Sequence, residues 1–258
     1  MLDNLEQEKP KIFKIYFTHT EPKPLGENEI WVSDVPELKR IMYCIGNSST
    51  IIFDDRMKET YPDIFSVYSS GNISALLEDL KCGYKEPEDA VNILKKIPVP
   101  MQIPDNMGSN PQAIEKKYVH KDNSENVFIS VPEQIGNLFY FQGFPEIPEI
   151  QIDHESDHFD GIKIFEVARQ ASIAAMALNG FPLDAINILT KNAISYKNFI
   201  DKNIPYYIQT LPAVKPKGGH LYCAFLIMQS GKTCAYGYFA GVGYTSKEDY
   251  LKIRKRGN

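Results

Sequence analysis

Residues 161–179 restrict the fold more than any other segment, because they predict one long helix built largely from small side chains. Asp160 stands at the expected N-cap and Gly180 just beyond the expected end, and both residue types favour these positions. Five alanines lie within the segment: Ala168, Ala171, Ala174, Ala175 and Ala177. Small side chains allow a sheet to approach a helix closely, so we expect strands to pack along this helix.

Strand patterns occur both before and after the predicted helix along the sequence. They occur at residues 125–131, 137–143, 186–199, 206–214, 220–228 and 233–244, and residues 229–232 form a tight hairpin turn between the last two. In the final strand, alternation places mostly small residues on one face: Ala235, Gly237, Phe239, Gly241 and Gly243. A long helix wrapped by a curved antiparallel sheet is the hotdog fold, so the sequence predicts an α+β hotdog architecture.

A proline-rich break separates this part from the preceding chain. Residues 97–111 contain four prolines, which disfavour a helix or a central strand and predict an extended linker or a long covering loop. We therefore expect an N-terminal unit at 1–97, a linker at 98–116 and the hotdog domain at 117–254.

The N-terminal unit alternates strand and helix patterns. Strands are predicted at 11–17, 29–35, 50–55 and 64–70, and helices at 36–45, 74–82 and 87–96. This alternation is typical of a small, partly parallel α/β layer. The sequence assigns this unit no role.

Composition excludes several classes of protein. The net charge is −5, and the only basic cluster is the short tail Lys252, Arg254, Lys255 and Arg256, so no nucleic acid partner is expected. No apolar run is long enough to span a membrane, and the N-terminus lacks the pattern of a signal peptide. The four cysteines are scattered and predict reduced thiols, so a cytoplasmic location is expected.

Ionisable residues gather around the start of the long helix. His154, Asp157 and His158 precede the helix, and Glu166, Arg169 and Gln170 share one of its faces by their spacing of three and four. On spacing alone, Glu166 and Arg169 form either a structural ion pair or part of a functional site. The two histidines lack the HExxH pattern of a zinc helix, so no metal is expected.

The string DHESDHFDGIKIFEVARQA at 153–171 resembles the signature of the A-factor biosynthesis (AfsA-like) hotdog family. YVHKDNSENVFIS at 118–130 resembles the opening strand of that family, and YLKIR at 250–254 resembles its end. The resemblance covers about residues 117–254.

This resemblance implies an acyltransferase of γ-butyrolactone signalling-molecule biosynthesis. A β-ketoacyl group would pass from an acyl carrier protein or coenzyme A thioester to the hydroxyl of a small phosphorylated acceptor, without a cofactor. Such a reaction needs a base and positive charge. Glu166 and Arg169 are the expected catalytic residues, the former as base. The expected substrate-binding residues are Gln170, His154, Asp157 and His158.

The chain also departs from the family pattern, and two alternatives stay open. The streptomycete-type synthases resemble two fused hotdog repeats, whereas this sequence contains one, so either two chains form a homodimer or residues 1–115 have another role. One alternative is a non-catalytic hotdog that binds an acyl thioester or a signalling lipid. The other is an acyl thioesterase or dehydratase, although the GHFP string of the dehydratases is absent.

Overall fold

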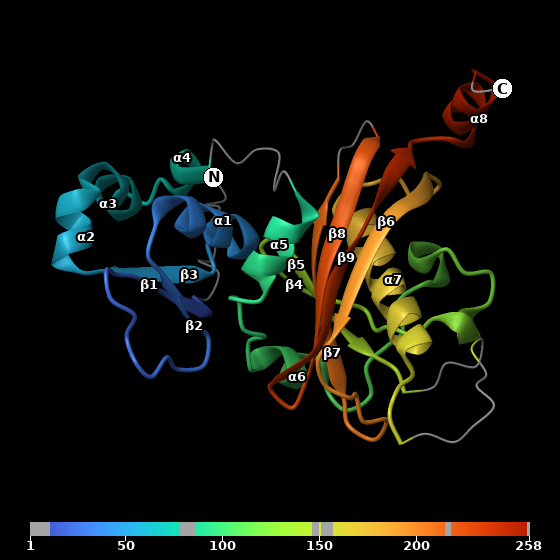
Figure 1. Cartoon of the computed structure of the whole chain (residues 1–258), viewed down its shortest axis with the longest axis horizontal. Coiled ribbons are helices and arrows are strands. Elements are labelled where there is room, and N and C mark those ends of the chain that lie inside the picture. The colour runs from blue at the N-terminus through green and yellow to red at the C-terminus, as the bar shows by residue number, and fades with distance from the viewer. Residues whose placement is uncertain (1–10, 78–85, 146–149, 151–156, 215–217, 257–258) are drawn as a thin grey trace, which may run out of the picture.

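The computed structural model describes residues 11–77, 86–145, 150, 157–214 and 218–256 (Figure 1). The predicted long helix is α7, Gly161–Leu178, and it lies against one face of a six-stranded antiparallel sheet. The strands follow the order β4-β5-β7-β8-β9-β6. They are β4 (Glu133–Ile135), β5 (Leu138–Gly143), β6 (Ile186–Tyr196), β7 (Tyr206–Ala213), β8 (Gly219–Gln229) and β9 (Lys232–Tyr244).

This arrangement confirms the predicted hotdog fold. The small side chains of α7 are fully buried against the sheet: Ala168, Ala171, Ala174 and Ala175. Gly243 of β9 illustrates the tight packing on the same side, because a Cβ atom there would overlap the side chains of Phe181 and Leu221. The interior between helix and sheet is filled by aromatic residues such as Phe141 and Phe225.

The N-terminal part is a three-stranded parallel layer, as predicted. Its order is β2-β1-β3, with β1 (Phe13–Phe17), β2 (Glu29–Val32) and β3 (Ser49–Phe53). Its helices are α1 (Val35–Ile45), α2 (Asp55–Thr60), α3 (Pro62–Ser69), α4 (Ile73–Leu77) and α5 (Pro87–Leu94). Helix α4 covers the described part of the helix predicted at 74–82. Asp34 caps α1 by accepting a hydrogen bond from the backbone N–H of Glu37 at 2.8 Å.

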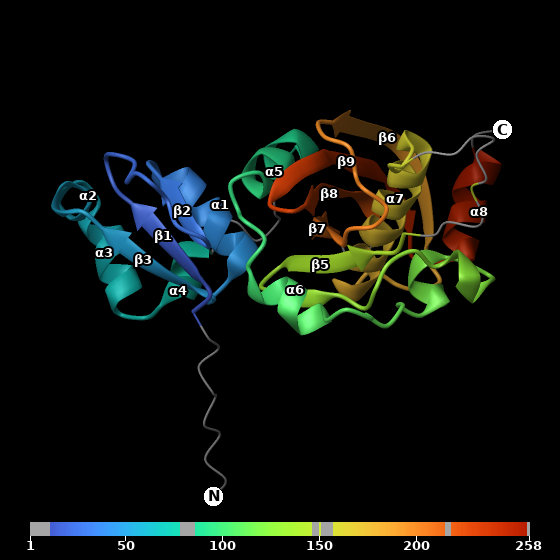
Figure 2. The ribbon, with the colours of Figure 1, turned by 90° about the horizontal axis from the view of Figure 1, so that it is seen from below.

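The two parts share one hydrophobic core. Helix α5 lies on the face of the large sheet opposite α7, over β8 and β9 (Figures 1 and 2). Leu94 of α5 belongs to the same buried cluster as Phe13 of β1 and as Tyr140 and Leu211 of the large sheet. The large sheet is therefore buried on both faces.

A second contact joins the end of α1 to the turn between β4 and β5. The backbone N–H of Asn137 donates to the carbonyl oxygen of Cys44 at 2.8 Å, and its side-chain amide donates to that of Tyr43 at 2.7 Å. These bonds satisfy carbonyl groups that a helix end leaves without intrahelical partners. Gly136 makes the approach possible, because it has a φ of +60° and its position leaves no room for a side chain.

Residues 64–69 belong to helix α3 and Ser70 is its C-cap, so the strand predicted at 64–70 is wrong. Pro62 and Asp63 in the first turn are residues that favour a helix start. Phe65 and Tyr68 lie one helical turn apart and both pack on Phe53 of β3, with ring centroids 5.2 Å and 5.5 Å away. The apolar residues therefore follow helical spacing.

The proline-rich segment is also not wholly extended, because it contains the short helix α6, Gln102–Met107. Pro104 occurs in the first turn of this helix, where a missing N–H leaves no intrahelical hydrogen bond unmade.

The first strand predicted for the hotdog part, at 125–131, is replaced largely by irregular structure. The short 3-10 helix η2 (Lys116–Val119) precedes this segment, and a second one, η3 (Ser124–Asn126), overlaps its start. Ile129 and Ser130 form only isolated bridges, and the N–H of Phe128 donates to a side chain of α7. At the other end, the basic tail forms helix α8, Lys247–Arg256 (Figure 1).

Replacing Gly136 with alanine should weaken the contact between α1 and the large sheet. A left-handed backbone costs a non-glycine residue about 1–2 kcal/mol, and the overlap with the Cys44 carbonyl adds to this cost. Gly71→Ala is the matched control, because Gly71 has a φ of +76° and open space around it. Urea unfolding measures both variants, and equal losses of stability would contradict the steric role of Gly136.

Candidate functional site

The candidate site is built on a bidentate ion pair on α7. The Arg169 Nε lies 2.7 Å from Glu166 Oε2, and the Arg169 Nη2 lies 2.7 Å from Glu166 Oε1. The spacing of three residues brings both side chains onto one face of the helix, as predicted. The Glu166 side chain is 13% exposed and that of Arg169 is 28% exposed, so the pair is largely shielded from water.

Gln170 fixes this pair to the segment that crosses α7. Its Nε2 donates to Glu166 Oε1 at 3.0 Å and to the carbonyl oxygen of Asn126 at 2.8 Å. Its Oε1 accepts the backbone N–H of Phe128 at 2.9 Å. Gln170 is fully buried, so in this structure its amide positions the protein chain. Its expected contact with substrate stays a prediction.

A second cation reaches the carboxylate from outside α7. The Lys121 Nζ lies 3.0 Å from Glu166 Oε1, and the Lys121 side chain is 12% exposed. The 3-10 helix η2 packs against α7, and its C-cap is His120, which has a φ of +55° and directly precedes Lys121. The left-handed turn at His120 thus directs the chain so that Lys121 contacts Glu166.

The electrostatics of the cluster keep Glu166 ionised. Burial alone would raise the pKa of its carboxyl group. The hydrogen bonds from Arg169, Gln170 and Lys121 together with the charge of Arg169 outweigh burial and lower the pKa to about 2. Burial and the charge of Arg169 also lower the pKa of the neighbouring His120. Glu166 is therefore a carboxylate at neutral pH.

The other predicted residues form a separate group before α7. The His158 Nδ1 lies 2.8 Å from Asp157 Oδ1, and this hydrogen bond lowers the pKa of Asp157. The His158 ring packs against Phe199 at 4.5 Å, and His158 forms a backbone bridge with Asp201. Asp157 and His158 thus contact each other and residues 199–202, whereas Glu166 contacts Arg169, Gln170 and Lys121. His154 lies outside the described residues.

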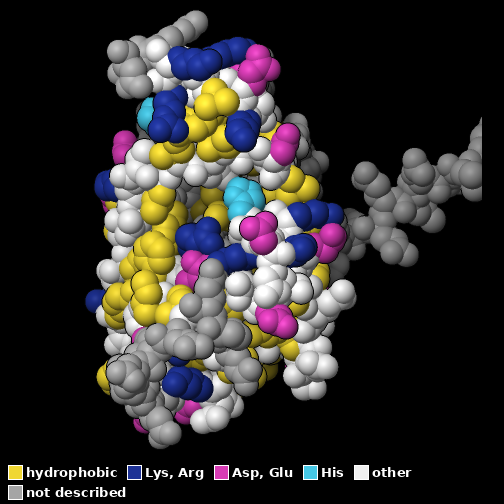
Figure 3. All heavy atoms as spheres, turned by 90° about the vertical axis from the view of Figure 1, so that its right-hand side faces the viewer, with side chains coloured by type: hydrophobic (Ala, Val, Ile, Leu, Met, Phe, Trp, Pro, Cys, Tyr) yellow, Lys and Arg dark blue, Asp and Glu magenta, His cyan; other side chains and the backbone are white. Residues whose placement is uncertain are grey.

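The surface on this side of the molecule is hollowed. Figure 3 shows a recess bordered by hydrophobic side chains, by Lys and Arg side chains, by acidic groups and by a histidine. Among the residues that the structure describes, no group of three or more His, Cys, Asp or Glu side chains could hold a metal ion.

His120 and Lys121 are members of the site that the sequence analysis did not identify. Their only sequence signal is their place in the string at 118–130, which resembles the family's opening strand. Nothing in local spacing relates them to Glu166, which is 45 residues further along the chain than Lys121. Their contribution depends on the tertiary fold.

No helix within the described parts of the chain is both long and apolar enough to cross a membrane.

A model of the family described as the A-factor biosynthesis hotdog domain, AfsA, matches residues 104–242, which is more than half of the chain. This match includes the whole cluster around Glu166. No curated protein matches the chain.

Several solved structures are similar to part of the chain. The dehydratase heterocomplex ApeI:P from Xenorhabdus doucetiae is 12% identical, with a TM-score of 0.43, over 54% of this chain and 95% of that one. A hypothetical thioesterase with coenzyme A from Streptococcus pneumoniae is 12% identical, with a TM-score of 0.38, over 50% and 96% of the two chains. An uncharacterized protein from Pyrococcus horikoshii is 16% identical, with a TM-score of 0.38, over 54% and 98%.

The stability that Glu166 contributes should depend on pH. Because its pKa falls from 4.5 to about 2 on folding, the contribution is present above pH 4.5 and is lost as the pH falls toward 2. We expect Glu166→Gln to cost roughly 3 kcal/mol at pH 7 and little at pH 2. Urea unfolding across this range measures the difference from the unmodified protein.

The control for this experiment is Glu248→Gln, which removes an exposed ion pair with Lys252. Exposed pairs contribute little, so this variant should follow the unmodified protein at every pH. A cost of Glu166→Gln that stays constant from pH 7 to pH 2 would contradict the depressed pKa.

Proposed function

Because the chain belongs to the AfsA family of A-factor biosynthesis hotdog domains, we propose that it is an acyltransferase acting on acyl thioesters. It would transfer a β-ketoacyl group from an acyl carrier protein or coenzyme A to a hydroxyl of a small phosphorylated acceptor. The product would be a precursor of a γ-butyrolactone signalling molecule, made in the cytoplasm. The observation that carries this proposal is the shielded Glu166 carboxylate held by Arg169 and Lys121.

Glu166 is the proposed base. The acceptor oxygen attacks the thioester carbonyl carbon while its proton passes to a carboxylate oxygen of Glu166. The resulting tetrahedral oxyanion then expels the thiolate with cleavage of the C–S bond, and the thiolate takes the proton back from Glu166. The ester and a free thiol are the products, so no oxidant or further reactant is needed.

The low pKa of Glu166 makes it a weak base at rest, and the acceptor itself can change this. Arg169 and Lys121 are also the groups that would bind a phosphate or an oxyanion. When a phosphate takes over part of their hydrogen bonding, the stabilisation of the Glu166 carboxylate falls while its burial remains. Its pKa then rises, and Glu166 becomes a stronger base only when the acceptor is bound.

The remaining predicted residues have supporting roles in this proposal. Gln170 positions Glu166 through the hydrogen bond at 3.0 Å and would reach the thioester carbonyl only after a rearrangement. Asp157 and His158, with His154, would line the entrance for the substrate.

A non-catalytic acyl-thioester or signalling-lipid binder is the second candidate. The observation that favours it is that Glu166 already accepts hydrogen bonds from Arg169, Gln170 and Lys121. In this candidate the carboxylate has a purely structural role, in which it holds α7 and residues 121–128 together. The remaining alternative is an acyl thioesterase, in which water would be the acceptor, or a dehydratase, which would need no acceptor.

The two candidates differ in whether the thioester is consumed. Incubation of the purified full chain with a β-ketoacyl-coenzyme A and dihydroxyacetone phosphate, followed by mass spectrometry, should reveal a new ester or butenolide. We expect Glu166→Gln to lower its rate of formation by about 10²-fold or more, as for loss of a general base. Arg169→Gln should lower it by about 10²-fold, as for loss of an oxyanion donor.

Glu248→Gln again serves as the control and should retain full activity, and circular dichroism should confirm that every variant is folded. Full activity in folded Glu166→Gln would rule out its role as base. Free acid without ester would indicate a thioesterase, and an intact thioester that stays bound to the protein would indicate a binder.

We also propose a homodimer through strand β6. This strand is at the edge of the large sheet, and within the described chain only β9 pairs with it. Leu189 and Tyr196 on β6 and the nearby Phe199 are 47%, 51% and 78% exposed. An exposed edge with large apolar side chains is prone to pair with another chain, so a second copy is its proposed partner.

Leu189→Asp should therefore shift the protein from dimer to monomer, because the charge would have to be buried in the interface. Light scattering after size-exclusion chromatography measures the mass. Leu251→Asp is the matched control, since Leu251 is 40% exposed and belongs to helix α8, which lies apart from β6 in Figure 1. A monomeric unmodified protein would contradict the proposal.

A further inference from the structure

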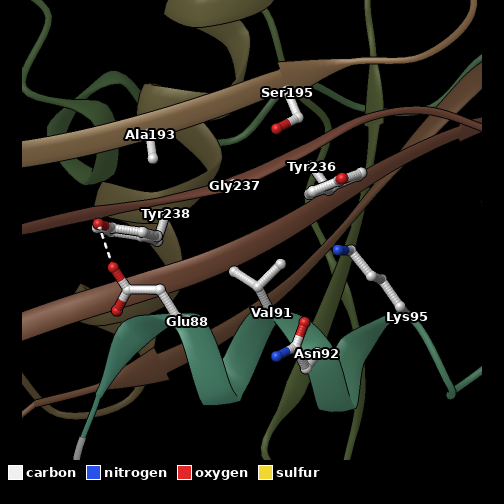
Figure 4. A pocket seen from close by; sticks show the side chains of 9 residues that line it. All are labelled: Glu88, Val91, Asn92, Lys95, Ala193, Ser195, Tyr236, Gly237 and Tyr238. Atoms are coloured by element: carbon white, nitrogen blue, oxygen red, sulfur yellow. Dashed lines mark hydrogen bonds between the residues drawn. The ribbon is translucent and has the colours of Figure 1, made fainter.

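A pocket lies on the face of the large sheet opposite the Glu166 cluster. Helix α5 of the N-terminal part forms one wall, and strands β6 and β9 form the other (Figure 4). The pocket has a volume of about 200 Å³. Its floor is formed by Ala193, whose small side chain leaves space between α5 and the sheet, and by the backbone at Gly237.

One end of the pocket is closed by a satisfied acidic group. The Glu88 carboxylate on α5 accepts a hydrogen bond from Tyr238 Oη at 2.7 Å and pairs with Lys191 Nζ at 2.9 Å. These two partners lower the pKa of Glu88 to about 2. Glu88 therefore holds α5 to the sheet, and its charge is already balanced by residues of the protein.

The other end gathers positive charge and hydroxyl groups. The Lys95 ammonium lies 3.5 Å from the centroid of the Tyr236 ring, and that of Lys197 lies 5.7 Å from it. Ser195 is the register partner of Tyr236 on the neighbouring strand, and it also lines the pocket. Among the described residues, neither Lys95 nor Lys197 forms an ion pair with a carboxylate. Two ammonium groups thus converge on one phenol without an anion.

We infer that this pocket binds a small organic anion with a flat apolar body. The anionic group would lie between Lys95 and Lys197 and accept hydrogen bonds from Ser195 and Tyr236, while the body rests against Val91 and the backbone at Gly237. A cavity of about 150 Å³ holds benzene, so a substituted ring fits the available space. Two ammonium groups favour a phosphate monoester over a carboxylate.

The position of the pocket gives the ligand a structural consequence. The ligand would touch both α5 and the large sheet, so its binding would stabilise the packing of the N-terminal part on the sheet. The alternative is a purely structural role, in which the two lysines and Tyr236 hold α5 to the sheet by cation–π contacts. A test of anion binding distinguishes a ligand site from this structural contact, because the structural contact requires no ligand.

Phenyl phosphate is the probe for this inference. Isothermal titration of the full chain should detect its binding, with benzoate and inorganic phosphate weaker and benzyl alcohol below detection. Lys197→Met should weaken binding by at least 10-fold, because its ammonium lies 5.7 Å from the centroid of the Tyr236 ring, which lines the pocket, and Lys197 does not belong to α5. Lys95→Met should have a similar effect, and Lys247→Met on α8 is the matched control.

The inference does not depend on the proposed acyltransferase activity, and one further variant separates the two sites. Arg169→Gln should leave unchanged the part of phenyl phosphate binding that Lys197→Met removes. Loss of binding in Arg169→Gln but not in Lys197→Met would place the ligand at the Glu166 cluster and overturn the inference. Absence of binding to the unmodified protein, or equal binding by all lysine variants, would overturn it as well.

Discussion

The burial of the large sheet on both faces is the constraint on which the rest of the structure depends. Along β8, alternate residues enter different cores: Cys223 and Phe225 pack toward α7, whereas Tyr222 and Ala224 belong to the cluster shared with the N-terminal part. A strand buried on both faces reads as a continuous apolar run. The N-terminal part therefore covers a surface that would otherwise expose several large apolar side chains, and it is integral to the packing of the hotdog sheet.

The sequence predicts those elements in which local pattern and tertiary packing agree. Three features follow from local pattern: the alanine-rich helix, the hairpin between the last two strands and the parallel N-terminal strands. Their side-chain periodicity reflects burial on a defined face. The errors occurred where a proline or a long-range hydrogen bond decided the structure. Pro62 and Pro104 lie in first helical turns, where proline is tolerated. The backbone near Phe128 departs from a strand because Gln170 accepts its N–H.

In the candidate site, too, some contacts follow from local sequence spacing and others depend on the tertiary fold. The pairing of Glu166 with Arg169 follows from helical spacing, which the sequence contains. The approach of Lys121 depends on the turn at His120 and on the packing of η2 against α7, and neither is encoded in local periodicity. The burial of Gln170 also changes its interpretation, because an amide with three protein partners acts first as a fixed support for its neighbours.

Opposing effects on Glu166 make the site sensitive to whatever binds beside it. Burial raises the pKa of its carboxyl group, and the two cations and the Gln170 amide lower it by more. Such a balance differs from that of an exposed ion pair, where water replaces a lost partner at little cost. At 13% exposure the Glu166 side chain has little access to water, so the loss of one cationic partner leaves burial less opposed. An anion that binds Arg169 would thereby change the chemistry of the carboxylate without touching it, and in the proposed acyl transfer this would link recognition of a charged acceptor to the strength of the base.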